Sequence, residues 1–273
     1  MGKVESRNNQ FADRHSTKIW LEKPLPDNPY IADELFCHGF NLTELMQKRN
    51  FIDVFFLLFN GQLPTRSQAK LLEQLMIALI NPGPRHASTR AGLNAAIGKT
   101  DSVHILPISL AVLGGAHLGA SEVEASMRFV KKQFRKPPEE VASHVLETTQ
   151  APDQGDWHPA PGFGSRFSSI DRFPQRLAEQ LLSLDAAGKY LRWGNEFAAT
   201  LNAQQMGWLI PGVAATALLD AGFNAKTGAG LFQLFSAPGL LAHGLEMTNK
   251  PITAMPFITD EDYIIEEPNS NGY

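Results

Sequence analysis

The feature that most constrains the fold of this chain is a series of helix start and stop signals that begins near residue 40. Asn41 and Glu44 have the spacing of a capping box, in which each side chain can satisfy a free backbone N–H at the start of a helix. The same spacing recurs in three further pairs: Thr65 with Gln68, Ser121 with Glu124, and Asn202 with Gln205. These signals predict a chain made mainly of α-helices.

Between the signals, apolar residues recur with the period of a helix. Phe51, Val54, Phe55 and Leu58 fall at i, i+3, i+4 and i+7, which predicts one apolar face, and Gly61 then provides a left-handed stop. Further helices are expected from Thr65 to the turn at 81–84, over 105–113, and from Asn202 to Gly222. No stretch alternates apolar and polar residues, so the prediction is an all-α fold with at most a short hairpin over residues 19–29.

Composition narrows the class of protein. Hydrophobic residues make up 43% of the 273 residues and charged residues 19%, as in ordinary globular proteins. A net charge of −4 provides no basic surface for nucleic acid. Cys37 is the only cysteine, which excludes an intrachain disulfide and agrees with a reducing cytoplasm. The first ten residues do not resemble a signal peptide, and no apolar run reaches the roughly 18 residues of a membrane helix. We therefore predict a cytoplasmic protein without nucleic-acid or membrane partners.

The helical pattern is interrupted at two places. The first 35 residues are polar and contain prolines, which predicts an arm over the surface or onto a partner subunit. Between residues 135 and 173 the pattern breaks into segments rich in proline, glycine and acidic residues. This middle region is predicted to be mobile or to form a smaller domain.

Three segments contain candidate functional residues. Residues 114–121 place His117 among small side chains at a helix start, where a ligand can approach closely and free N–H groups are available, although a structural histidine fits as well. Residues 159–166 form a glycine-rich loop that Arg166, Arg172 and Arg176 follow, a combination able to hold phosphates. The loop lacks the spacing of known nucleotide fingerprints, so a solvated basic loop is the alternative.

The remaining histidines are weaker candidates. His243 lies on the apolar helical segment 240–246 and is either a hydrogen-bonded core residue or a ligand. His86 and His158 lie in loops and are predicted to be surface residues. No pair of histidines has metal-ligand spacing on a helix, so no metal site is predicted.

The order and spacing of five motifs resemble the citrate synthase superfamily, in particular its citryl-CoA lyase branch, over roughly residues 17–260. The motifs are Gly61-Gln62-Leu63-Pro64-Thr65, the histidine motif from Gly114 to Ala120, Gly162-Phe163-Gly164-Ser165-Arg166, Arg176, and the segment from Pro238 to Glu246. The resemblance implies a homodimer whose subunit has a large helical domain, residues 1–120 and 206–273, with a partly extended arm over 1–35. A smaller domain, residues 121–205, would close over coenzyme A and exclude water.

The resemblance also assigns roles to individual positions. His117 corresponds to the histidine that faces the thioester, and the histidine that faces the ketone falls on Ser165. Other substrate-facing residues of the family fall on Pro82, Pro211, which takes the place of the family's aspartate base, and Ser236. Arg176 is the remaining carboxylate-binding group, and His243 and His158 complete the expected substrate site, with His158 a candidate base for a β-hydroxyl. Gly162, Phe163, Gly164 and Arg166 would contact coenzyme A.

These departures predict altered chemistry. Loss of a general base costs about 10²–10⁴-fold in rate, and each lost charged hydrogen bond about 1.5–3 kcal/mol, so efficient citrate chemistry is not expected. One hypothesis is an acyl-CoA carbon–carbon lyase or acyltransferase with no permanently bound cofactor. It would use an acyl-CoA thioester and a carboxylate or carbonyl co-substrate more apolar than oxaloacetate. The second is a degenerate homologue that binds a CoA ester or a protein partner without turnover. The third is a helical dimer that shares only the architecture.

Overall fold

The structure is a computed structural model that describes residues 11–266, and it divides into two compact units, Met1–Ala69 and Lys70–Tyr273. The described part of the chain is mainly helical, as predicted. Each unit also contains one small antiparallel sheet, which is more strand than the single hairpin expected. No helix within residues 11–266 is both long enough and apolar enough to cross a membrane.

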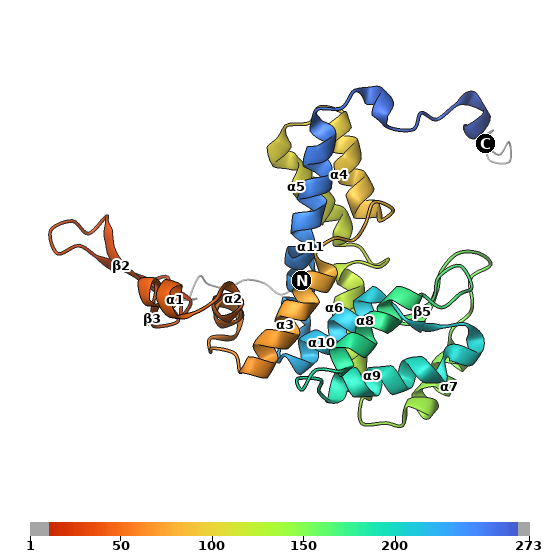
Figure 1. Ribbon diagram of the computed structural model, residues 1–273, viewed down its shortest axis with the longest axis horizontal. Helices are drawn as coiled ribbons and strands as arrows, with labels where there is room; N and C mark the ends of the chain where they lie inside the picture. Colours follow the sequence, from red (N-terminus) through yellow and green to blue (C-terminus); the bar gives the residue numbers. More distant parts are fainter. Residues whose placement is uncertain (1–10, 267–273) are drawn as a thin grey trace, which may run out of the picture. The chain divides into compact units, whose positions relative to one another are not determined.

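The first unit consists of a hairpin sheet and short helices (Figure 1). Its elements are β1 (Trp20–Pro24), β2 (Ala32–Cys37), β3 (Phe40–Asn41), α1 (Leu42–Lys48), α2 (Phe51–Asn60) and the start of α3 (Arg66–Leu79). The hairpin predicted over residues 19–29 exists, but Trp20 pairs with Cys37, so it reaches further along the chain. All residues of β1 are exposed, which explains why the sequence shows no apolar–polar alternation there. Part of the predicted arm, residues 1–10, lies outside the described residues.

Two predicted capping sites form in this unit. The side chain of Asn41 accepts hydrogen bonds from the N–H groups of Thr43 and Glu44 and starts α1. Thr65 and Gln68 form a complete capping box, with N–H to side-chain oxygen distances of 3.0 and 3.2 Å. Gly61 ends α2 with a φ of 72°, the left-handed conformation expected there.

The buried face of α2 differs from the predicted one. Phe51 is 71% exposed and Leu58 is also exposed, whereas Phe56 and Leu57 are buried. Leu57 packs in a small core that includes Cys37. The prediction failed because apolar side chains occur on nearly every side of this helix, so that periodicity alone cannot identify the face that packs.

The second unit contains the longer helices and a second sheet. In Figure 1, α4, α5 and α11 run side by side, and α10 lies among α6, α8 and α9. The region between residues 135 and 173, predicted to be irregular, contains one helix and two strands. The elements are α4 (Ala87–Ile97), α5 (Ser102–Leu113), α6 (Ala120–Gln133), α7 (Pro138–Thr148), β4 (Trp157–Ala160), β5 (Phe163–Ser165), α8 (Arg172–Leu182), α9 (Lys189–Thr200), η1 (Asn202–Gln204), β6 (Gly207–Trp208), α10 (Ile210–Asp220), α11 (Ala225–Thr248), η2 (Ile252–Ala254) and η3 (Asp260–Asp262).

Two predicted helix starts are wrong in detail. Helix α6 begins at Ala120, but the hydroxyl of Ser121 donates to the carbonyl of Gly114 (2.6 Å) and does not cap the helix. The helix expected from Asn202 begins only at Ile210. A 3₁₀ turn, a left-handed residue and strand β6 come first, and a proline then occupies the first turn of the helix, where its missing N–H costs nothing.

The core of this unit holds the β4–β5 turn firmly. Phe163 of β5 is fully buried and packs against Phe197 and Trp208, with ring centroids 4.9 and 4.8 Å apart. Gly162 has a φ of 80°, and a Cβ atom there would lie 2.5 Å from the Cα of Gly212. The glycines of this turn therefore allow the backbone to cross the start of α10 at close range.

Asp220, at the end of α10, supplies the cap that α9 lacks. Gly188 precedes α9 and has no capping side chain, but the carboxylate of Asp220 accepts from the N–H groups of Gly188, Tyr190 and Leu191 at 3.1, 3.0 and 2.9 Å. Burial raises the pKa of this carboxyl group, and the three donors act in the opposite direction. One side chain thus joins two helices that pack together.

We predict that Asp220→Ala lowers the free energy of unfolding by about 1–3 kcal/mol, because it leaves half-buried N–H groups without acceptors. Urea denaturation followed by circular dichroism measures this change. The matched control is Asp185→Ala, an exposed aspartate whose loss should change stability by less than about 0.5 kcal/mol. Equal stabilities of the two variants would contradict the capping role.

Candidate active site

Two adjoining cavities in the second unit form the candidate active site. The smaller has a volume of about 210 Å³ and the larger about 760 Å³. They share five lining residues, which come from the loop after α3, the loop before α6 and the loop after β5: Pro82, His86, Leu118, Arg166 and Asp171. Ligands in the two cavities would therefore lie next to each other.

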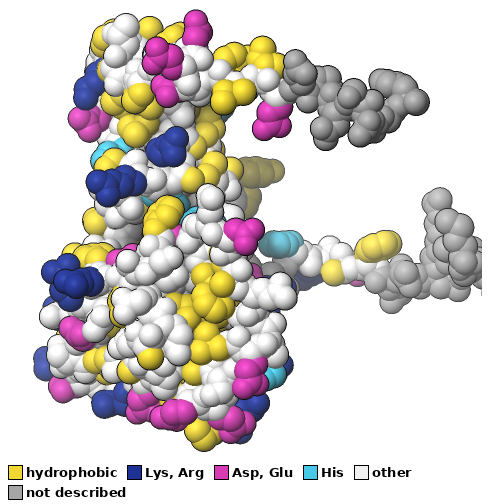
Figure 2. All heavy atoms as spheres, turned by 90° about the vertical axis from the view of Figure 1, so that its right-hand side faces the viewer, with side chains coloured by type: hydrophobic (Ala, Val, Ile, Leu, Met, Phe, Trp, Pro, Cys, Tyr) yellow, Lys and Arg dark blue, Asp and Glu magenta, His cyan; other side chains and the backbone are white. Residues whose placement is uncertain are grey.

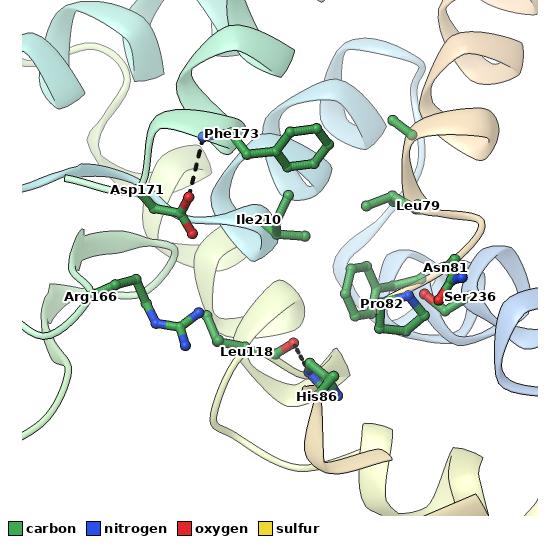
Figure 3. A pocket seen from close by; sticks show the side chains of 12 residues that line it. Leu79, Asn81, Pro82, His86, Leu118, Arg166, Asp171, Phe173, Ile210 and Ser236 are labelled. Atoms are coloured by element: carbon green, nitrogen blue, oxygen red, sulfur yellow. Dashed lines mark hydrogen bonds between the residues drawn. The ribbon is translucent and has the colours of Figure 1, made fainter. Parts of the chain in front are cut away.

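The smaller cavity is largely apolar. Leu79, Phe173, Ile210 and Phe232 contribute its apolar walls. Figure 3 shows Arg166 and Asp171 on the opposite side of this cavity from Asn81, Pro82 and Ser236. A small uncharged group fits such a pocket better than a compound with several carboxylates does.

The larger cavity is strongly basic. Four arginines line it, Arg85, Arg90, Arg166 and Arg172, together with two histidines and one acidic residue. Guanidinium groups bind phosphates and carboxylates through charge-assisted hydrogen bonds. This cavity is suited to an anionic ligand.

His117 lies at the larger cavity, on the loop between α5 and α6. Its side chain is 66% exposed, and its Nε2 atom lies 3.5 Å from Oδ2 of Asp156. Its ring stacks on that of His158, with centroids 5.4 Å apart and an interplanar angle of 14°. Asp156 is only 5% exposed. It forms an ion pair with Arg166 (2.5 Å), and its other oxygen accepts from the N–H of Phe167 (3.1 Å). Asp156 thereby connects His117 with Arg166.

A buried carboxylate, Glu122, holds the segments of the site together. One of its oxygens accepts from the N–H of Leu118 (2.7 Å), and the other accepts from the N–H of Gly162 (3.1 Å). The second oxygen also lies 2.8 Å from Nδ1 of His158. Leu118 has a φ of 54°, an uncommon conformation for leucine that this hydrogen bond helps to maintain. Glu122 thus fixes the backbone on both sides of the His117–His158 pair.

His86 is a site residue that the sequence analysis placed on the surface. It is half-buried and lines both cavities. Its Nδ1 accepts from the N–H of Ser88 and so caps α4, while Nε2 lies 3.4 Å from the carbonyl oxygen of Leu118. Burial lowers the pKa of His86, and the positive charges of His117 and Arg166 add to the effect. Histidine is not a usual helix cap, so no sequence rule indicates this role.

Several predicted site residues lie at or beside the cavities. Pro82, Arg166 and Ser236 line the smaller cavity, and His117 lines the larger. His243 lies behind the smaller cavity, where its Nε2 is 3.1 Å from Nδ2 of the lining residue Asn81. His158 lies behind His117 and, contrary to prediction, is mostly buried.

Other predicted residues lie elsewhere. Arg176 lines a separate cavity of about 630 Å³, which shares Ile170 and Arg172 with the larger one. Ser165 and Pro211 are buried in the protein. Gly162, Phe163 and Gly164 take part in the packing of the β4–β5 turn, and neither cavity has them in its lining. The roles assigned to all these residues remain predictions.

Three residues of the site can also be considered as ligands for a cation. His117, Asp156 and His158 each offer one ligand atom, and these atoms lie within 4.8 Å of one another. The cluster joins residues from two segments of the chain, which is why the sequence showed no metal-ligand spacing.

Comparisons with known proteins identify the fold. No family model and no curated protein sequence matches the chain. Among solved structures, citryl-CoA lyase from Hydrogenobacter thermophilus has a TM-score of 0.74 and 22% identity over 95% of this chain and 96% of its own. An ATP citrate lyase from Methanosaeta concilii, in complex with (3S)-citryl-CoA, has a TM-score of 0.76 and 16% identity over 96% of this chain and 43% of its own.

A third similar structure is citrate synthase from Thermoplasma acidophilum, with a TM-score of 0.61 and 18% identity over 82% of this chain and 58% of its own. The chain thus matches nearly the whole citryl-CoA lyase but less than half of the ATP citrate lyase chain. The chain shares the helical fold of these three enzymes. This confirms, at the level of the fold, the resemblance seen in the motifs.

The lowered pKa of His86 predicts a specific pH dependence of stability. A histidine whose pKa is lower in the folded protein stabilises it fully above the unfolded value of about 6.5, and this contribution is lost as the pH falls through the folded pKa. His86→Asn keeps a good capping residue but cannot titrate. We expect wild type to lose more stability than His86→Asn between pH 7.5 and pH 5, measured by urea unfolding. Parallel stability curves would contradict the assignment.

Proposed function

We propose that this protein is an enzyme that makes or breaks a carbon–carbon bond next to a CoA thioester. The supporting observation is the pair of adjoining cavities, one basic and lined by His117, the other mainly apolar, in a chain with a citrate synthase-like fold. Coenzyme A derivatives occur in the name of the similar citryl-CoA lyase and as bound ligands of the other two, (3S)-citryl-CoA in ATP citrate lyase and carboxymethyl coenzyme A in citrate synthase. The proposal extends this chemistry to a different partner molecule.

The basic cavity is the proposed binding site for coenzyme A. CoA carries several phosphate charges, and the four arginines of the cavity offer complementary donors. Arg166 lines both cavities and is therefore placed near the junction of the phosphate-bearing and reacting parts of the ligand. In this proposal Arg166 also meets any single carboxylate of the co-substrate, a role first predicted for Arg176.

The apolar cavity is the proposed site of the reacting carbonyl partner. Ser236 and Asn81 supply uncharged polar groups there, while Pro82 and the surrounding aliphatic and aromatic side chains exclude water. A carbonyl oxygen can be held by such groups, whereas a second or third carboxylate would be buried without a cation. Oxaloacetate and citrate are therefore excluded from the proposal in favour of a smaller, less charged carbonyl compound.

In the cleavage direction, the β-hydroxyl of an acyl-CoA loses its proton and becomes a carbonyl as the bond between the α- and β-carbons breaks. The electron pair of that bond passes to the α-carbon and the thioester oxygen as an enolate, which then takes up a proton. His117 is proposed to stabilise the charge on that oxygen, which is an oxyanion-hole role. The condensation direction is the reverse of these steps.

A homodimer and a cytoplasmic location are parts of this proposal. The segment that follows α11 exposes large hydrophobic side chains, among them Phe257, Ile258, Ile264 and Ile265. In Figure 2, hydrophobic side chains reach the surface near the C-terminal end of α11. Exposed apolar residues of this kind are typical of surfaces that a second subunit covers. The single cysteine, Cys37, is buried and free, which suits a reducing compartment.

The alternative is a homologue that binds a CoA ester or a protein partner without turnover. Proline at positions 82 and 211 and the burial of Ser165 favour it, because none of these can transfer a proton at the cavities. The experiments that follow separate the two functions.

We predict that His117→Ala lowers the rate of cleavage of the correct β-hydroxyacyl-CoA by about 10²–10³-fold, the usual effect of removing one oxyanion-hole donor. A panel of β-hydroxyacyl-CoA thioesters, followed by chromatography of the acyl-CoA products, measures the rate. Because the His117 side chain is exposed, the variant should melt like wild type. His144→Ala, at an exposed histidine of α7, is the matched control. If wild type and His117→Ala give identical traces throughout the panel, the non-catalytic alternative is favoured.

We also predict that CoA thioesters stabilise the protein against heat. A ligand at 100 times its dissociation constant adds about 2.7 kcal/mol, which a thermal melt detects. Arg85→Ala and Arg90→Ala should each weaken CoA binding by roughly tenfold or more, since each removes a charge-assisted hydrogen bond. Arg192→Ala, at an exposed arginine of α9, should bind as wild type does. If no CoA thioester shifts the melting temperature, only the architecture is shared with the superfamily.

A further inference from the structure

The structure brings His117 together with two further potential ligands, Asp156 and His158, to which the proposed reaction assigns no role. Nε2 of His117 lies 3.5 Å from Oδ2 of Asp156, and Nε2 of His158 lies 4.0 Å from the same oxygen. His117 comes from the loop before α6, while Asp156 and His158 come from the beginning of β4. Three potential ligand atoms thus meet at the edge of the larger cavity.

Two of these atoms are buried without a hydrogen-bond partner. Oδ2 of Asp156 and Nε2 of His158 have no surface exposed to solvent and take part in no hydrogen bond. Buried polar atoms are nearly always satisfied, so Nε2 of His158 indicates a group that binds beside it, whereas Oδ2 of Asp156 already faces the guanidinium of Arg166. The remaining contact of Oδ2 is its ion pair with Arg166.

Neighbouring groups orient His158 and Asp156 so that each can offer one atom to a metal ion. Nδ1 of His158 lies 2.8 Å from Oε1 of Glu122, and because a carboxylate only accepts, Nδ1 carries the proton. The lone pair of Nε2 then faces the cluster. At metal sites, a histidine that binds the metal through one ring nitrogen commonly donates the N–H of its other ring nitrogen to a carboxylate. Oδ1 of Asp156 accepts from the N–H of Phe167, which leaves Oδ2 as the oxygen directed at the cluster.

The distances suit a single ion of moderate size. Metal–ligand bonds of about 2.0–2.1 Å in a tetrahedral site separate the ligand atoms by roughly 3.3–3.5 Å. The His117–Asp156 separation has this value, whereas the 4.0 Å between Asp156 and His158 exceeds it, so these two side chains must approach each other for one ion to bind both. The two imidazole rings are stacked in this structure, so the ring of His117 must turn for both Nε2 atoms to face one ion. His117 is exposed and can adjust its side chain to complete the set.

The charges of the site are compatible with a cation. The groups in contact with the cluster contribute two negative charges, from Glu122 and Asp156, and one positive charge, from Arg166, whereas the adjoining cavity carries three further arginines. A carboxylate oxygen has two lone pairs, so Oδ2 can bind a metal ion and still pair with the guanidinium.

We propose that His117, Asp156 and His158 bind one divalent transition-metal ion, of the class of Zn²⁺, Co²⁺ or Fe²⁺. Two imidazoles and one carboxylate suit these ions better than Mg²⁺ or Ca²⁺, which prefer oxygen ligands alone. Three protein ligands leave at least one position open, and the exposure of His117 places it on the side of the larger cavity.

The site also deepens the proposed function, on which this consequence rests. An ion held by His117, Asp156 and His158 would polarise a carbonyl oxygen at the larger cavity, an effect that the hydroxyl of Ser165 and the ring of Pro211 cannot supply. When bound, it would supply the stabilisation of the thioester oxygen that is proposed for His117 in the metal-free protein. The binding of the ion itself does not depend on the reaction.

The test is a titration of tag-free, chelator-treated protein with Co²⁺, followed by visible absorption, and with Zn²⁺, followed by calorimetry. We expect one ion per chain and visible bands typical of cobalt bound to nitrogen and oxygen. His117→Ala and His158→Ala should each weaken binding by at least tenfold, and Glu122→Gln by about 10–100-fold. His104→Ala and His144→Ala, at exposed histidines of α5 and α7, serve as matched controls and should bind as wild type does.

Two results would overturn the proposal: no binding by wild type, or equal affinity in wild type and His117→Ala. His117→Ala is the decisive variant because its exposed side chain can be removed without disturbing the core, which a melt of the metal-free protein verifies. The titrations contain no CoA ester. Their failure would therefore leave the proposed function intact, and a failed cleavage assay would not affect the metal site.

Discussion

The carboxylate of Glu122 is the contact on which the arrangement of the site depends. It joins three segments that are distant in sequence, the backbone after His117, the turn at Gly162 and the ring of His158. A buried carboxylate is tolerated when several donors form hydrogen bonds with it. The loss of any one of these hydrogen bonds lowers the stability of the folded protein. The cavity walls, the left-handed Leu118 and the stacked histidines all follow from keeping this one group satisfied.

Much of the fold could be predicted from local sequence patterns. The caps at Asn41 and Thr65 and the stop at Gly61 depend on neighbouring residues only, and they form as predicted. The late start of α10 and the two sheets could not be predicted, because they depend on pairing between segments that a local pattern does not contain. In α2, apolar side chains occur on nearly every side, so that only tertiary packing decides which residues become buried.

The candidate site was predicted in part. The histidine motif and Arg166 were found because the order of motifs along the chain is itself informative. His86, Asp156 and Glu122 were missed or placed on the surface. Each acts through a contact with a residue more than 10 positions away, such as Asp156 with Phe167 and Glu122 with Gly162. Single-sequence reasoning detects residue types and spacing, and a buried carboxylate that organises a site has neither a motif nor a fixed spacing.

The small sheet of the second unit limits where the chain can bend. Strand β5 pairs with β6, and the N–H of Leu209 donates to the carbonyl of Gly162 at 3.0 Å, so these hydrogen bonds cross position 205, the predicted end of the smaller domain. The close crossing of Gly162 and Gly212 adds a steric link at the same place. If the smaller domain predicted from the sequence rotates to enclose a ligand, these contacts require β6 and the first turn of α10 to move together with the β4–β5 turn. The residues up to Gly212 would then belong with the β4–β5 turn in such a movement.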